Sequence, residues 1–175
     1  MAVYKAKDDK TPPLFPELFP LGGALDPQNR WVRLAALVRW NEIDEIYRKY
    51  FSFIGRPARD SRIVAGIFMV ALLERVSDEE AVTLFNENPY IQHFCGLGNF
   101  ATGAALADGK LLYRARKRLG AEAFARFETN LLGMLAVHEE LRAKFAFYKK
   151  KPRAHGWRGK LAEKMRALAA RLEHR

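Results

Sequence analysis

Hydrophobic residues recur every three or four positions along most of this chain, the spacing that places them on one face of a helix. We expect helices over residues 26–40, 42–51, 62–75, 77–87, 90–95, 110–119 and 121–147. No segment alternates between apolar and polar residues over six or more positions, so we expect essentially no sheet. The pattern therefore predicts an all-α fold, a compact multi-helix domain.

Short polar residues and prolines predict where these helices begin and end. Asp26-Pro27 has the composition of an N-cap followed by the first helical residue, and Ser61 is expected to cap the helix over 62–75. Ser77 with Glu80 three residues later predicts a capping box. Asn88-Pro89 predicts the end of that helix, because proline lacks a backbone N–H and disfavours helical geometry in the residue before it.

The helices over 62–75 and 77–87 are joined by a tight turn, which is compatible with two arrangements. In a DNA-binding helix-turn-helix the second helix would enter the major groove. Its first turn, however, carries Asp78, Glu79 and Glu80, which would face phosphates unfavourably, and the first helix is apolar on nearly every side. We therefore favour a helical hairpin inside the core over a base-reading motif.

Charge divides the chain into regions. Residues 1–141 carry 18 Lys+Arg and 18 Asp+Glu, whereas residues 142–175 carry 12 Lys+Arg and 2 Asp+Glu and so account for the whole net charge of +10. We expect an irregular proline-rich arm over 1–24, a helical domain over 25–147, and a basic hinge with an amphipathic helix over 148–175. A basic extension on a neutral domain favours a polyanionic partner, with nucleic acid the commonest and an anionic membrane surface the rival.

Two segments near the middle of the chain resemble a known family. They are Val76-Ser77-Asp78-Glu79-Glu80 and Asn88-Pro89-Tyr90-Ile91-Gln92-His93-Phe94-Cys95-Gly96. Both resemble the N-terminal domain of DDE-type insertion-sequence transposases of the insertion-sequence-five group. Further landmarks of the same family extend the resemblance over roughly residues 21 to 132: Leu25-Asp26-Pro27, residues 34–40, Gly55-Arg56-Pro57 and Arg116-Lys117-Arg118-Leu119-Gly120.

Two groups of cations are the candidate DNA-binding residues, because each phosphate contact adds affinity through counterion release. The first group contains five cations within nine residues: Lys110, Arg114, Arg116, Lys117 and Arg118. The second lies in the basic tail: Lys149, Lys150, Lys151, Arg153, Arg158 and Lys160. The alternative interpretations are a solvated helix face for the first group and a solvated chain end for the second. The resemblance favours DNA as the partner.

An apolar stripe in the last predicted helix supports an alternative function. Leu161, Met165, Leu168 and Leu172 share one face, which suits docking on another helical protein, a full-length transposase or a second copy of this chain. The alternative is therefore a helical protein–protein interaction or oligomerisation module with no DNA role. A membrane-surface helix is less favoured, because the stripe carries no aromatic residue.

The family resemblance also implies what should catalyse strand cleavage. Transposases of this type hold two divalent metal ions, such as Mg²⁺, with three carboxylates on an RNase-H-like core that follows the N-terminal domain. Only 34 residues follow position 141, with Glu163 and Glu173 as their acids, so we expect a truncated, non-catalytic protein and carry over no catalytic residue. The predicted function is a DNA-binding domain that competes with full-length transposase for element ends.

Other residues argue against cofactors, metals and membrane segments. The histidines have no second ligand at metal-binding spacing, and Cys95 fits a small buried hydrophobe, so we expect no metal site and no cofactor. The chain begins without the apolar core of a signal peptide, and its longest apolar run, residues 63–73, is about half of the roughly 20 residues that a membrane span needs. We expect a cytoplasmic, nucleoid-associated protein.

Overall fold

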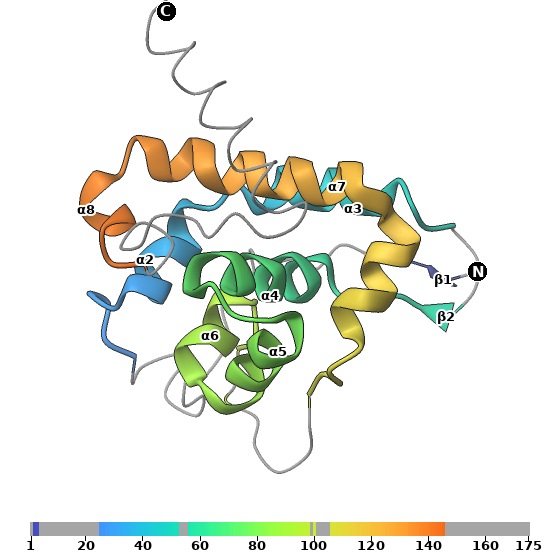
Figure 1. Ribbon diagram of the computed structural model, residues 1–175, viewed down its shortest axis with the longest axis horizontal. Helices are drawn as coiled ribbons and strands as arrows, with labels where there is room; N and C mark the ends of the chain where they lie inside the picture. The colour runs from blue at the N-terminus through green and yellow to red at the C-terminus, as the bar shows by residue number, and fades with distance from the viewer. Residues whose placement is uncertain (1, 4–24, 53–55, 99, 101–105, 146–175) are drawn as a thin grey trace, which may run out of the picture.

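Helices make up nearly all the regular structure in the computed structural model, which describes residues 2–3, 25–52, 56–98, 100 and 106–145 (Figure 1). The helices of this described part are α2 (Arg30–Leu37), α3 (Trp40–Arg48), α4 (Ser61–Glu74), α5 (Asp78–Glu87), α6 (Pro89–Phe94), α7 (Leu111–Ala136) and α8 (Glu139–Arg142). Two residues of β1 (Ala2–Val3) pair in parallel with two of β2 (Arg56–Pro57). The all-α prediction is confirmed. Most of the predicted arm and all of the predicted tail helix lie outside the described residues.

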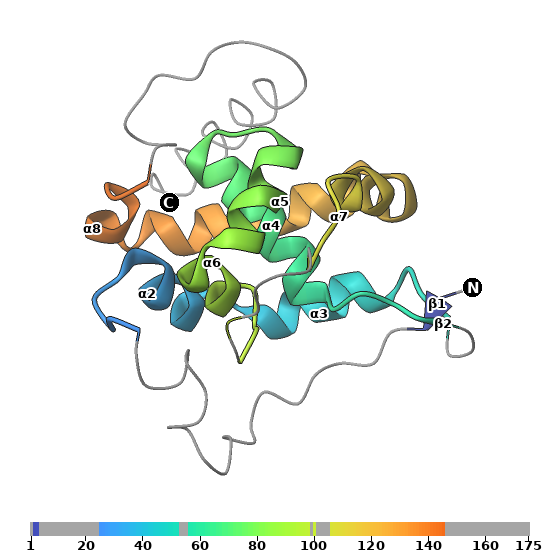
Figure 2. The ribbon, with the colours of Figure 1, turned by 90° about the horizontal axis from the view of Figure 1, so that it is seen from below.

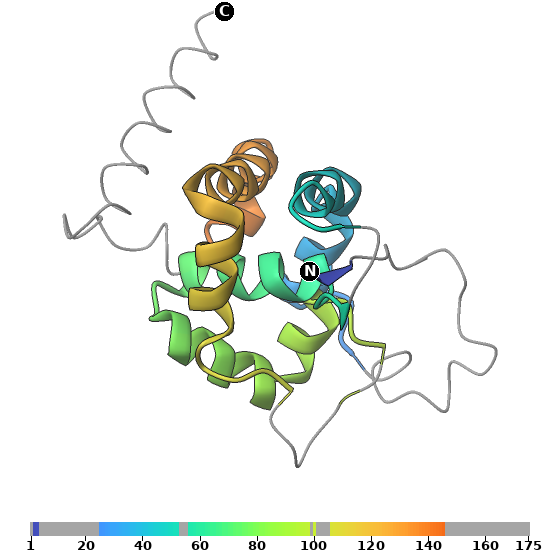
Figure 3. The same cartoon turned by 90° about the vertical axis from the view of Figure 1, so that its right-hand side faces the viewer.

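Helix α4 forms the centre of the core. Its residues are buried on almost every side, including Ile67, Met69 and Val70, as its apolar sequence predicts. Figure 3 shows α3 and α7 on one side of α4 and α5 and α6 on the other, and α4 contacts α3, α5 and α7. Helix α5 packs directly on this buried helix, so the two form a helical hairpin. The preference for a core hairpin over a base-reading motif stays a prediction, because the two helices of a helix-turn-helix also pack on each other.

Ser77 and Asn88 cap α5 and α6 as predicted, although among the described residues no hydrogen bond from the Ser77 N–H to the Glu80 side chain completes the capping box. The Oγ of Ser77 accepts a hydrogen bond from the backbone N–H of Glu80 at 3.1 Å, which caps α5. Asn88 ends α5 and begins α6, where its Oδ1 accepts from the N–H of Tyr90 at 2.9 Å. Pro89 then occupies the first helical position, where its missing N–H costs nothing.

The aromatic residues of α6 and its neighbours form a buried cluster. Phe94 is fully buried, and its ring centroid lies 5.2 Å from those of both Trp31 and Trp40. Helices α4 and α6 approach closely beside this cluster, since a Cβ added at Gly66 would lie 2.7 Å from the Sγ of Cys95. Residues 90–96 therefore serve mainly to build the core.

Two of the predicted caps are wrong by a few residues. Asp26 accepts a hydrogen bond from the N–H of Gln28 in a local turn, and Asn29 caps α2 instead by accepting from the N–H of Trp31. At α4 the cap is Asp60, and the hydroxyl of Ser61 donates to Asp44. In both places another short polar residue, one turn or less from the predicted one, accepts the N-capping hydrogen bond.

The last predicted helix of the domain, over residues 121–147, is shorter in the structure than the sequence predicts. The predicted stop at Gly120 is present as a kink within α7, where φ is 71° and ψ is 176°. The following helix ends at Ala136 rather than at residue 147. Beyond it, α8 turns back beside α2 and buries Leu141 (Figure 2). Phe145, which follows α8, is also buried, and its ring centroid lies 5.1 Å from that of Trp31. A straight helix would carry both side chains away from the core.

Candidate nucleic-acid interface

The cations predicted at the start of α7 do not share one environment. Lys110 lies at the N-cap position, and Arg114, Lys117 and Arg118 follow it as exposed residues of the first turns of α7. Positions 110, 114 and 117 fall along one side of a helix. Tyr113 lies among them with 66% of its surface exposed. This stretch presents cations and an aromatic ring together to solvent.

Arg116 points into the protein instead. Its guanidinium donates two hydrogen bonds to the carboxylate of Asp78 at the start of α5, at 3.0 and 3.1 Å. It also lies 5.3 Å from the ring centroid of Phe68 and 4.7 Å from that of Phe124. The paired fork and the aromatic contacts give Arg116 a structural role, fixing α7 on α5 and α4.

Arg114 carries a charge that is locally offset. Its Nη2 lies 2.7 Å from the Oδ2 of Asp108, and both side chains are more than half exposed. The hydrogen bond from the Arg114 side chain, followed by one from the backbone N–H of Lys110, holds the pKa of Asp108 below its usual value. An exposed pair of this kind contributes little to stability, so a phosphate can replace the carboxylate at small cost.

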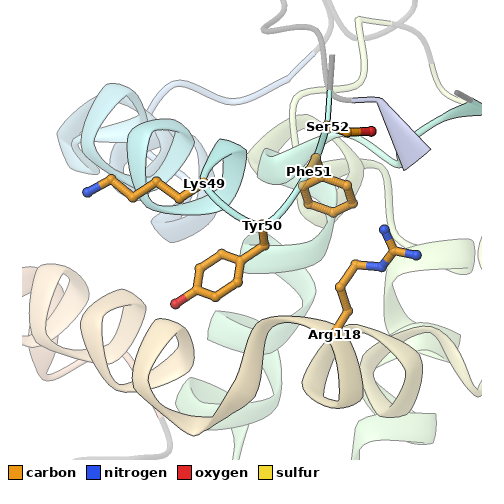
Figure 4. A pocket seen from close by; sticks show the side chains of 5 residues that line it. All are labelled: Lys49, Tyr50, Phe51, Ser52 and Arg118. Atoms are coloured by element: carbon orange, nitrogen blue, oxygen red, sulfur yellow. The ribbon is translucent and has the colours of Figure 1, made fainter. Parts of the chain in front are cut away.

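Arg118 lines a groove between the end of α3 and α7, just before the Gly120 kink (Figure 4). The groove has a volume of about 440 Å³ and is lined by Lys49, Tyr50, Phe51, Ser52 and Arg118. The guanidinium of Arg118 lies 5.1 Å from the ring centroid of Phe51. Among the described residues, neither Lys49 nor Arg118 has an ion-pair partner.

Sequence reasoning missed the α3 side of this groove. Lys49 and Tyr50 follow α3 directly, so their helical spacing indicated only the end of an amphipathic helix. A cation beside an aromatic residue at a helix end is a weak signal for nucleic-acid contact. The signal is stronger in the folded chain, because Arg118, 68 positions after Tyr50, lines the same groove.

The remaining predicted residues cannot be placed. Lys149, Lys150, Lys151, Arg153, Arg158 and Lys160 lie outside the described residues, as does the apolar stripe from Leu161 to Leu172. Both the basic tail and the alternative interaction surface therefore stay predictions. Within the part of the chain that the structure describes, no three His, Cys, Asp or Glu side chains are grouped so that they could hold a metal ion. No described helix is long and apolar enough to cross a membrane.

Comparison with known proteins identifies the family. The family described as "Transposase domain (DUF772)" matches residues 19–118, more than half of the chain. The chain belongs to this transposase-domain family. The matched segment of the transposase domain extends from before α2 through α6 and ends at Arg118, so it contains both sides of the groove.

One curated relative is similar over the same length of sequence. It is an uncharacterized protein, ORF8 in the nfe locus of Rhizobium meliloti, 35% identical over 100 residues. The alignment covers 57% of this chain and 48% of the relative, so it spans about half of that protein's length. No solved structure matches the chain.

Proposed function

We propose that this transposase domain binds double-stranded DNA through its phosphate backbone. The contact surface is the α7 cationic face, which we define as Lys110, Arg114, Lys117 and Arg118, assisted by the basic tail. The proposal rests on the different environments of the cations at the start of α7. Arg116 holds the helix against α5, while the four cations around it are exposed. A cation-bearing helix fixed in this way loses little conformational freedom when it meets a phosphate.

Membership of a transposase family supports a role associated with transposition. We further infer that the transposase is of the DDE type, on the resemblance of residues 76–96 to the insertion-sequence-five group. The described helices offer cations for phosphates and no cluster of carboxylates for divalent ions. We therefore propose that they bind DNA, at element ends or nonspecifically, without cleaving it.

A salt titration of the full chain tests the proposal. Fluorescence polarisation would measure Kd for a labelled duplex of about 25 base pairs between about 50 and 300 mM salt. We expect log Kd to rise linearly with log salt concentration, with a slope of about 0.9 for each phosphate neutralised. Absence of binding at the lowest salt concentration would overturn the proposal.

Charge-removing variants locate the contact. Lys110→Gln with Lys117→Gln should lower the slope by about 2, because each residue neutralises one phosphate. The control is Arg126→Gln, which removes an exposed arginine beyond the kink that is already paired with Glu122 at 2.7 Å. It should leave the slope unchanged. Replacement of Lys149, Lys150 and Lys151 by glutamine measures separately how much the basic tail contributes to the slope.

A further inference from the structure

The groove between α3 and α7 has features that the binding of duplex phosphates does not require. Aromatic rings line it beside the two cations, and none of its five lining residues is acidic. Phosphates need only the cations, whereas aromatic rings attract the flat faces of bases. Bases inside a duplex are stacked on one another and cannot present those faces.

The Phe51 ring lies between the side chains of Tyr47 and Arg118. Tyr47 is buried, and its hydroxyl donates to the backbone carbonyl of Arg59 at 3.0 Å. Burial raises the pKa of this hydroxyl, so it remains a donor across the physiological range. The Phe51 ring lies 4.6 Å from the Tyr47 ring, and Arg118 lies over Phe51 in turn. Tyr47, Phe51 and Arg118 therefore form a stack.

Tyr50 forms the accessible aromatic surface of the groove. It follows α3 and is 36% exposed, whereas Tyr47, on α3 itself, is buried. Figure 4 shows Tyr50 between Lys49 and Arg118, with the ring directed toward α7 and the Arg118 side chain directed toward Phe51. The groove volume of about 440 Å³ lies in the range of small-ligand sites.

We propose that this groove binds an unpaired nucleotide of DNA, with the base against Tyr50 and the flanking phosphates held by Lys49 and Arg118. The inference rests on the proposed function and narrows its substrate class from duplex alone to duplex with a single-stranded end. Stacking accepts any base, because every base has a π face. The groove therefore selects for an unpaired strand rather than for a sequence.

Three DNAs separate base stacking from charge. The first is a blunt duplex, the second carries a short thymidine overhang, and the third carries an abasic overhang with the same number of phosphates. Fluorescence polarisation on the full chain gives Kd for each. We expect the thymidine overhang to bind at least about fivefold more tightly than the abasic one, the lower end of the contribution of one stacked base.

Variants of the full chain assign that difference to the groove. Tyr50→Leu should reduce the thymidine-to-abasic ratio to about one, whereas Tyr50→Phe keeps the ring and should preserve the ratio. The matched control, Tyr113→Leu, alters an exposed tyrosine on α7 that does not line the groove and should also preserve the ratio. Circular dichroism verifies that each variant is folded.

The outcomes distinguish the two proposals. Equal binding of the thymidine and abasic overhangs, with the blunt duplex still bound, overturns the groove inference and leaves duplex binding intact. A ratio that persists in Tyr50→Leu overturns the assignment to this groove. Failure to bind any of the three DNAs overturns both proposals. The same duplex with an RNA overhang serves as a fourth probe. If its Kd is about fivefold lower than that of the thymidine overhang, the ligand of the groove is RNA rather than DNA.

Discussion

Asp78 and Arg116 are joined by two hydrogen bonds, from Nε to Oδ2 at 3.0 Å and from Nη2 to Oδ1 at 3.1 Å. Their side chains are only 21% and 22% exposed, so solvent screens the pair weakly. The pair links the first turn of α5 to the part of α7 that carries the exposed cations. The orientation of the α7 cationic face therefore depends on an aspartate 38 positions earlier in the sequence.

Removal of either partner should destabilise the domain. We expect Arg116→Ala or Asp78→Ala to lower the free energy of unfolding by about 1 to 3 kcal/mol, because each removes both charge-assisted hydrogen bonds between two partly buried groups. Urea denaturation measures the loss. The control is Glu122→Ala, which removes an exposed i,i+4 pair with Arg126 and should change stability by about 0.5 kcal/mol or less. Equal effects at the two sites would contradict the prediction.

Gly120 should resist substitution although space surrounds it. A Cβ there would meet nothing within 4 Å, but φ of 71° with ψ of 176° belongs to a backbone region essentially confined to glycine. Gly120→Ala should therefore cost about 1 to 3 kcal/mol of stability through backbone strain alone.

Gly133 provides the matched comparison, because it lies within α7 and also has nothing within 4 Å of an added Cβ. Gly133→Ala should raise the free energy of unfolding by about 0.5 to 1 kcal/mol, since alanine is the better helix former. Thermal unfolding of both variants shows whether each substitution raises or lowers the melting temperature. A shift in the same direction for both would refute the assignment of strain to Gly120.

His93 should make stability depend on pH near neutrality. Burial, followed by the charge of Arg62, lowers the pKa of His93 in the folded chain below its usual 6.5. Between the two pKa values the unfolded chain binds more protons, so the free energy of unfolding should fall as pH drops through 6.5. The fall should end below the folded pKa, where both states are protonated.

His93→Gln should remove this part of the pH dependence. Urea denaturation between about pH 5 and 8 gives the profile for the natural chain and for the variant, and their difference isolates the imidazole from the carboxylates. Profiles that differ only by a constant offset would show that His93 titrates alike in the folded and unfolded chain.

Cys95 should be unreactive in the folded protein. Its side chain is fully buried against α4, and burial raises the pKa of the thiol, so the reactive thiolate is scarce. At about pH 8 we expect an aromatic disulfide reagent to react with the native chain only as fast as the core opens, and far faster in denaturant. A native rate equal to that of a free cysteine derivative would contradict the burial.

The predictions that succeeded from sequence depend on partners close in the chain. Ser77 caps α5 through a group three residues away, and Asn88 caps α6 through groups two and three residues away. The error at Asp26 arose at the same scale, because Asn29 offered equivalent chemistry one turn later. Local patterns therefore identify a helix reliably and its first residue less so.

The features that sequence could not supply depend on distant partners. Helical spacing places Arg116 on the same face as the buried Leu112 and Leu119, but the sequence does not reveal that its partner is Asp78. The helix predicted to reach residue 147 ends at Ala136, and the chain beyond it packs Phe145 on Trp31, more than a hundred positions earlier. The groove likewise exists only once α7 lies against the end of α3.

The return of α8 onto α2 affects how the protein folds as it is synthesised. The family match ends at Arg118, yet Phe124, Phe127, Leu131 and Phe145 are buried in the same core as Trp31 and Leu34. The buried core thus extends beyond the residues that the family match covers. During synthesis this core cannot close completely until Phe145 has left the ribosome, because Trp31 lacks that packing partner before then.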